Sequence, residues 1–316
     1  MNKTEAQKIN VGVDTGKDFL DLHVRPLNEH FKVTNDKKGI GEAIKRLKKF
    51  NIERIVIEAT GRYEALFMAA YAKANLPFSL VNPVQVKRFA GAIGRKAKTD
   101  KLDAALIAHF SEVIQPPLST LKPENMQKMA DALTRRNQLL EMQTREKNRL
   151  QIMPKNLQPS IKAILTVLKK QIQKMDDELA LLIESCPEFK AKSELLQSMP
   201  GIGKVSAAAL ISYLPELGLM NSKEVAALVG VAPMSKESGR SKGKQVTQGG
   251  RHQVRTVLFM AIMSAMQCNA TFKSTYARLV EAGKPKKVAI IACVRKMVVI
   301  LNSMVRDGVM WEQKTV

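Results

Sequence analysis

The sequence predicts an α/β domain followed by two mainly helical regions. Short apolar runs alternate with helical patterns from the start of the chain to about residue 115, which is typical of α/β domains. From about residue 124 to 185 no strand signal appears, and apolar residues recur at helical spacing. The rest of the chain is predicted to be helical, apart from one polar, glycine-rich segment. Its 316 residues are enough for two domains of ordinary size.

The first strands each end in or near an acidic residue. Two short apolar runs joined by Gly16-Lys17-Asp18 predict a β-hairpin with Asp14 on its first strand. Ile55-Val-Ile57 predicts a buried strand that ends at Glu58, and Thr60-Gly61 is expected to open the next helix. A further strand is expected at Phe78–Asn82, before Pro83.

A pair of aspartates lies in Lys98-Thr-Asp-Lys-Leu-Asp103, a segment that is expected to start a helix. Asp100 and Asp103 are three residues apart, so both carboxylates leave one face of that helix. One interpretation is a solvated helix start, where the helix dipole stabilises acidic side chains near the N-terminus. The other is a cation site, because neighbouring carboxylates repel each other unless a cation lies between them.

Together with Asp14 and Glu58, this pair gives four acids at strand ends or at a helix start. Open α/β sheets place active sites at such ends. Hard oxygen ligands without a nearby His or Cys cluster indicate Mg²⁺ or Mn²⁺ rather than zinc. The chemistry that suits such a site is two-metal phosphoryl transfer, with two ions about 3.5–4 Å apart.

The charge of the chain indicates a polyanionic partner. It has 51 lysine and arginine residues against 29 acidic ones, a net charge of +22. Nucleic acid is favoured over a membrane, because we expect no apolar run close to the roughly 18 residues that span a bilayer. A polar N-terminus and three scattered cysteines predict a cytoplasmic, reduced protein.

The middle of the chain predicts a helical hairpin. A basic helix from about residue 124 to 152 is followed by a break at Pro154 and Pro159 and by a second helix over Ile161–Ser185. Such a pair serves either as an oligomerisation or spacer element or as simple packing helices.

Two later segments predict contacts with nucleic acid. Pro200-Gly-Ile-Gly203 between apolar helices is a helix-hairpin-helix pattern, whose turn offers backbone N–H groups and Lys204 to a phosphate; a plain helical corner is the alternative. Met234–Arg251 is polar, glycine-rich and basic. Because it lies between the apolar helical segments Val225–Val229 and Val254–Met266, it is expected to be a presented loop rather than only a flexible one.

These motifs, in this order, resemble those of the DEDD transposases. The pattern is Val-Gly-Val-Asp14, Ile-Glu58-Ala-Thr-Gly, Lys-Thr-Asp100-Lys-Leu-Asp103, Pro-Gly-Ile-Gly, then Glu-Ser238-Gly-Arg and Gly-Gly-Arg251. These enzymes form the insertion-sequence family numbered one-ten and are related to the Piv-type DNA invertases. The likeness extends over nearly the whole chain.

The resemblance implies a fold and a division of the chain. It implies a RuvC-like, RNase H-type α/β domain over 1–118, a long helical hairpin or coiled coil over 119–190, and a mainly α C-terminal domain over 191–316 that contains the helix-hairpin-helix and a catalytic-serine loop. It further implies a recombinase that pairs donor and target DNA through a structured bridge RNA, and that works as a dimer assembling to a tetramer with Mg²⁺. Its expected place is the cytoplasm, at the nucleoid.

The resemblance also assigns roles to residues. Asp14, Glu58, Asp100 and Asp103 become metal ligands, and Ser238 becomes the nucleophile that is joined to a DNA end. Ser238 directly precedes Gly239, as in the family, although Ser235 and Ser241 lie three residues to either side. The basic residues expected to contact nucleic acid are Lys204, Arg240, Lys242, Lys244, Arg251 and Arg255.

Three other functions compete with this one. A RuvC-like, structure-specific endonuclease would use water and would need the acids but not Ser238. A non-enzymatic DNA-binding protein would make the four acids a coincidence. A sugar-kinase-like ATPase, suggested by Gly12–Gly16, would lack its second phosphate loop. The product, whether integration, excision or inversion, depends on nucleic acids outside this chain.

The net charge of +22 leads to the first prediction. Binding to nucleic acid should weaken steeply with salt, at a log–log slope of roughly −0.7 to −0.9 per phosphate neutralised. Fluorescence anisotropy with labelled nucleic acid between low and physiological salt measures the slope. A nearly flat dependence would exclude nucleic acid as the main partner.

Overall fold

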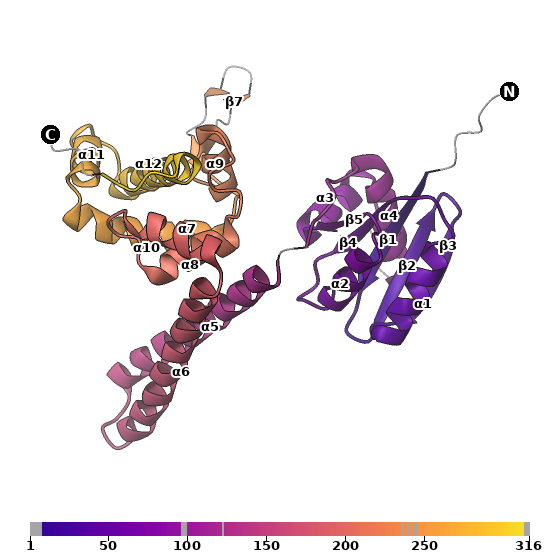
Figure 1. Cartoon of the computed structure of the whole chain (residues 1–316), viewed down its shortest axis with the longest axis horizontal. Helices are drawn as coiled ribbons and strands as arrows, with labels where there is room; N and C mark the ends of the chain where they lie inside the picture. The colour runs from indigo at the N-terminus through magenta and orange to yellow at the C-terminus, as the bar shows by residue number, and fades with distance from the viewer. Residues whose placement is uncertain are drawn as a thin grey trace. The chain divides into compact units, whose positions relative to one another are not determined.

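The computed structural model describes residues 8–95, 100–121, 123–234, 237–238, 241–242 and 245–312. It divides the chain into two compact units, Met1–Lys122 and Pro123–Val316 (Figure 1). The side chains of residues 100–101, 237–238 and 241–242 lie outside the description.

Unit 1 is built on a sheet that has five strands within the described residues, in the order β3-β2-β1-β4-β5. Their bounds are β1 Ile9–Thr15, β2 Phe19–Arg25, β3 Glu29–Thr34, β4 Ile52–Glu58 and β5 Phe78–Val81. β1, β2 and β3 are antiparallel neighbours, whereas β4 and β5 run parallel to β1. This order with these directions is that of the RNase H-like sheet, as expected for this part of the chain.

The predicted hairpin with Asp14 on its first strand is confirmed, because β1 and β2 pair around residues 16–18. The aspartate pair does begin a helix, α4 (Asp100–Ile114). The helix expected to open at Thr60-Gly61 instead begins at Ala65, after a turn that ends at Glu64. Gly61 has a φ of +59°, in the left-handed region, which ends rather than begins regular structure.

One face of the sheet is apolar and is covered by two helices. α1 (Lys37–Leu47) is capped by Asp36, whose carboxylate accepts from the Gly39 N–H at 2.8 Å. α2 (Ala65–Lys73) contributes Phe67 and Tyr71. Their buried side chains pack on alternate strand residues, which gives the main core of this unit: Val11, Val13, Leu20, Leu22, Val24, Ile55 and Ile57.

The opposite face receives α4, with α3 (Pro83–Ala92) beside it. Val56 packs there against Leu106, Ile107 and Phe110 of α4. α4 lies directly on β1 at Gly12, where a Cβ atom would stand 2.2 Å from the Ala108 nitrogen and 2.3 Å from the Ala104 oxygen. Only glycine allows this approach of helix to strand.

Unit 2 begins with two long helices, α5 (Glu124–Ile152) and α6 (Gln158–Glu184). They lie side by side along their length (Figure 1), with Leu139, Leu168 and Ile172 in a small apolar cluster between them. The Arg136 guanidinium donates to Asp176 at 2.5 Å and ties the two helices together.

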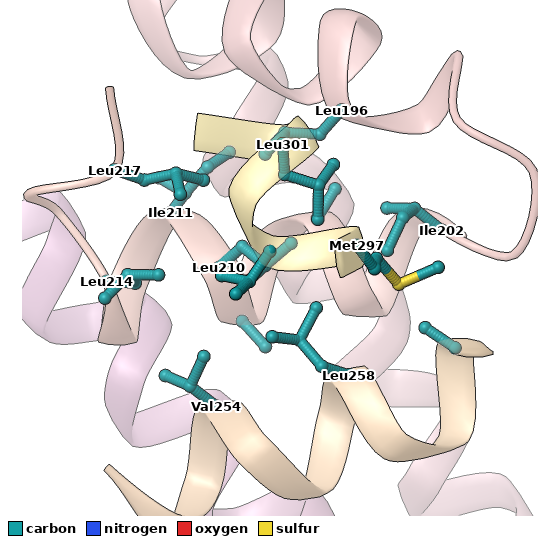
Figure 2. Close-up of a cluster of buried hydrophobic side chains, with 14 of the residues drawn as sticks. Leu196, Ile202, Leu210, Ile211, Leu214, Leu217, Val254, Leu258, Met297 and Leu301 are labelled. Atoms are coloured by element: carbon teal, nitrogen blue, oxygen red, sulfur yellow. The ribbon is translucent and has the colours of Figure 1, made fainter. Parts of the chain in front are cut away.

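The rest of unit 2 is a helical body with one core. Its helices are α7 (Pro187–Gln197), α8 (Lys204–Tyr213), α9 (Ser222–Val229), α10 (His252–Cys268), α11 (Ala270–Glu281) and α12 (Lys286–Asp307). Leucines and other apolar side chains from α7, α8, α10 and α12 meet in its centre, as Figure 2 shows for Leu196, Leu210, Leu258 and Leu301.

α12 corrects the expectation that no apolar run approaches a membrane-spanning length. Within the described residues it is the helix long and apolar enough, by length and composition, to cross a membrane. Its Cys293, Met297 and Leu301 are fully buried in the core of unit 2. The apolar pattern of α12 therefore reflects a core helix packed on several sides.

The close contact at Gly12 leads to the second prediction. Gly12→Ala should destabilise the protein by about 3 kcal/mol, because the new Cβ meets backbone atoms of α4 that cannot rotate away. Gly41→Ala in α1 is the control, since its Cβ would meet nothing within 4 Å and should instead stabilise the helix by about 0.5–1 kcal/mol. Urea unfolding measures both; equal effects of the two substitutions would contradict the close packing.

Candidate active site

The strand register places Asp14 and Glu58 side by side. β1 and β4 are parallel, with Gly12 beside Val56 and Val13 beside Ile57, so the next position brings Asp14 next to Glu58. Side chains alternate along a strand, so Asp14 and Glu58 share the face of Gly12 and Val56, which is the face that α4 covers. Both carboxylates are half-buried.

The packing of α4 brings Asp103 to the same end of the sheet. The Ser111 hydroxyl donates to Asn10 at 2.8 Å, and the Ala104–Ala108 turn lies against Gly12, so α4 runs antiparallel to β1. Two strand residues span about the length of 4.5 helix residues. Asp14 lies two residues beyond Gly12 on β1, so it is expected beside the part of α4 that precedes Ala104–Ala108 by about one turn. That part is the first turn of α4, which contains Asp103.

The structure thus brings Asp14, Glu58 and the first turn of α4 to one end of the sheet. Asp100 is the first residue of α4, and its side chain lies outside the described residues. Among the side chains that are described, no three His, Cys, Asp or Glu groups are close enough to hold an ion together. The donor set is nevertheless one of carboxylate oxygens, which fits Mg²⁺ or Mn²⁺.

A buried acid next to Asp14 was missed by the sequence reasoning. Asp21 on β2 is the cross-strand partner of Asp14, and it is only 6% exposed. Its two carboxylate oxygens lie 3.0 Å from His30 Nε2 and 3.2 Å from Lys32 Nζ, both on β3. The signal was present in Glu29–Thr34, where polar and apolar residues alternate as in a strand.

The predicted serine loop rises between α9 and α10 as two short antiparallel ladders. Pro233 and Met234 (β6) pair with Val246 and Thr247 (β9), and further out Glu237–Ser238 (β7) pairs with Ser241–Lys242 (β8). Ser238 is opposite Ser241. Ser235, Arg240 and Lys244 lie outside the described residues, as do the side chains of Ser238, Ser241 and Lys242.

The base of this loop is closed by two glycines in contact. Gly230 and Gly250 have φ angles of +77° and +69°, and a Cβ on Gly250 would stand 2.3 Å from the Gly230 nitrogen. The Arg255 guanidinium donates to the oxygens of Val229 at 3.2 Å and Gly249 at 2.6 Å. The side of the loop that leaves α9 is thereby fastened to the side that enters α10.

Arg251 makes a second anchor at the same place. Its guanidinium donates to both carboxylate oxygens of Glu216, at 2.5 and 2.6 Å, and to the backbone carbonyl oxygen of Tyr213 at 2.9 Å. Arg251 and Arg255 were predicted to contact nucleic acid, and in the structure both guanidinium groups bond to acceptors within the protein. Glu216 was not singled out from the sequence, since it lies 35 positions from its partner.

Lys204 stands at the start of α8 and is exposed. The preceding turn packs inward at Gly201, whose Cβ would meet the Ala261 oxygen at 2.5 Å, whereas a Cβ on Gly203 would meet nothing within 4 Å. The outer side of the turn is therefore the Gly203–Lys204 side. Lys204 also borders a depression that contains the acids Asp176, Asp177, Glu184 and Glu194.

Two family models match the chain and together account for most of it. A model described as a transposase, of the DEDD type of IS110, matches residues 11–157, and a model described as the transposase IS116/IS110/IS902 family matches residues 193–277. The chain belongs to the IS110 family of transposases. Membership of this family makes the protein a DNA-cleaving enzyme of the transposase and recombinase class. DNA is therefore its partner.

Two relatives that match along nearly their whole length agree with this assignment. The pilin gene-inverting proteins of Moraxella lacunata and Moraxella bovis are each 27% identical over 95% of this chain and 97% of theirs. An uncharacterised protein of insertion element IS110 from Streptomyces coelicolor is 28% identical over 49% of this chain and 38% of its own. Thermus thermophilus RuvC in complex with a Holliday junction aligns with 36% of this chain at 18% identity, with a TM-score of 0.29.

The glycine contact under the serine loop leads to the third prediction. Gly249→Ala and Gly250→Ala both place alanine in the left-handed region, at a cost of about 1–2 kcal/mol each. Only Gly250→Ala also meets backbone, so thermal unfolding should show a further loss of about 1–3 kcal/mol for it alone. If the two variants are equally stable, the loop is not closed at this contact.

Proposed function

We propose that this transposase cuts and rejoins DNA at a site where Asp14, Glu58, Asp100 and Asp103 bind divalent cations. The observation that supports the proposal most directly is the convergence of Asp14, Glu58 and the first turn of α4 at one end of the sheet. Mg²⁺ is the expected cation, with Mn²⁺ able to replace it, and two ions suit the chemistry. The ions would polarise the phosphate that reacts and offset its developing charge.

Ser238 is the proposed nucleophile. Its Oγ attacks a DNA phosphorus and forms a serine–phosphate ester, while the bond from phosphorus to the leaving sugar oxygen breaks. The serine proton passes to a base, and the leaving oxygen takes up a proton and departs as a hydroxyl. A serine hydroxyl needs such activation, and its loop is basic rather than acidic, so the acid cluster is the proposed source.

The covalent step also explains how the ends could be rejoined. The ester keeps the energy of the original phosphodiester, so attack by a second DNA hydroxyl restores a DNA strand and releases Ser238 without ATP. This feature distinguishes a recombinase from a structure-specific, RuvC-like endonuclease, in which water would end the reaction. The relatives include gene-inverting proteins and insertion-element proteins, so an assay should score inversion, integration and excision.

The basic residues are proposed to hold nucleic acid. Lys204, at the outer side of its turn, together with Arg240, Lys242 and Lys244 of the serine loop, would contact phosphates, whereas Arg251 and Arg255 would support the loop from its base. We further propose a structured bridge RNA as guide, a dimer that assembles to a tetramer, a cytoplasmic, nucleoid location, and the three-part division 1–118, 119–190 and 191–316. Sequencing RNA that copurifies with the protein tests the guide.

The fourth prediction tests the acids and the serine together. Asp14→Asn, Glu58→Gln and Asp103→Asn should each reduce recombination by more than about a hundredfold, the upper loss typical for a residue that only supports a metal ligand. Ser238→Ala should abolish a protease-sensitive protein–DNA adduct on a denaturing gel. Ser235→Ala and Ser241→Ala are the matched controls and should still form it.

Each alternative has its own result in this assay. DNA cut by the unaltered protein without any adduct would establish a water-dependent endonuclease. An adduct that persists in Ser238→Ala would assign the nucleophile to a neighbouring serine. Normal recombination by Asp103→Asn, with Mg²⁺ as the sole divalent ion, would exclude the proposed metal site.

A further inference from the structure

An exposed aromatic ring lies on the same face of the sheet as Asp14. Phe19 begins β2 and is 47% exposed. Side chains alternate along β2, so Phe19 and Asp21 point to the face of Asp14, while Leu20 and Leu22 enter the apolar core on the other side. A single exposed apolar residue is common on protein surfaces, so what matters is what surrounds this one.

Lys32 fixes the surroundings of the ring. Its ammonium group lies 4.8 Å from the centre of the Phe19 ring and 3.2 Å from the buried Asp21 carboxylate. A lysine held by a buried acid has less freedom to swing away, which keeps a positive charge beside the ring. Ring, lysine and acid therefore form a connected surface that leads across the strands to Asp14.

These side chains line one open depression beside Asp14. It has a volume of about 220 Å³, and Asp14, Lys17, Phe19, Asp21 and Lys32 are among its lining residues. An aromatic ring with two ammonium groups is the combination that binds one base by stacking and its phosphate by charge. The volume suits a single base, in keeping with an aromatic content of only 5% for the chain.

We propose that this depression binds one nucleotide of the DNA strand, next to the phosphate that reacts. The base rests on Phe19, and the phosphate of that nucleotide lies near Lys17 and Lys32. The inference rests on the proposed function, because it takes Asp14 to mark the place of reaction. Phe19 would thereby position the strand without contacting the reacting atoms.

The fifth prediction compares the loss of cleavage rate caused by Phe19→Ala with the loss caused by removing one DNA base, and the two losses should not add. The protein with its copurified RNA is given duplex DNA around the mapped cut site, in which one nucleotide at a time is made abasic. For the unaltered protein, one abasic position should lower the cleavage rate at limiting enzyme by about tenfold. Phe19→Ala should lose as much on intact DNA and lose nothing more at that position, whereas Phe19→Tyr should retain activity.

The controls separate a lost contact from a lost fold. Leu27→Ala removes an exposed apolar side chain, 42% exposed, from the turn at the other end of the β2–β3 pair and should cleave normally. If Phe19→Ala cleaves normally, or if the abasic loss is as large in Phe19→Ala as in the unaltered protein, the nucleotide site is refuted. Normal cleavage by Asp14→Asn would instead refute the proposed function, whatever Phe19→Ala does.

Discussion

The contact between α4 and β1 at Gly12 is the constraint on which the arrangement of unit 1 depends. Because Gly12 has no side chain, the backbone of α4 at Ala104 and Ala108 lies directly on the strand. The hydrogen bond from Ser111 to Asn10 fixes the position of α4 along the length of β1. With both the distance and the register set, the first turn of α4 arrives beside Asp14 rather than elsewhere on the sheet.

Unit 2 uses the same kind of contact under its serine loop. Gly230 and Gly250 meet backbone to backbone, and the Arg255 guanidinium bridges carbonyl oxygens from both sides of the loop. Arg251, paired with Glu216, fastens the start of α10 to the end of α8. In unit 1 the contact between backbones lies two residues from Asp14, and in unit 2 it closes the base of the serine loop.

Sequence patterns predicted the elements whose signals are local. The β1–β2 hairpin and the start of α4 follow from residue alternation and from the placement of Gly16 and Asp100. β3 was missed, although its alternation is visible, because Glu29, His30 and Lys32 made the segment look polar. The apolar α12 was overlooked as a long run, since Arg295 and Lys296 divide it.

Pairings between distant residues could not be predicted from one sequence. That Asp21 is buried with Lys32, and that Arg251 and Arg255 bond within the protein, depends on which strands and helices become neighbours. Arg240, Arg251 and Arg255 were therefore all predicted to contact nucleic acid. Asp14 and Glu58 could be singled out as candidates because a carboxylate at the end of an apolar strand is expensive to bury without a function, and their binding of metal stays a prediction.

Binding of Mn²⁺ to the protein without nucleic acid tests the central claim most directly, because it depends on the acids alone. Electron paramagnetic resonance of free Mn²⁺ during a protein titration measures the affinity. The account predicts saturable binding that Asp14→Asn weakens by at least about tenfold and that Glu42→Gln, an exposed acid on α1, leaves unchanged. Equal affinity for Mn²⁺ in the unaltered protein and Asp14→Asn would contradict it.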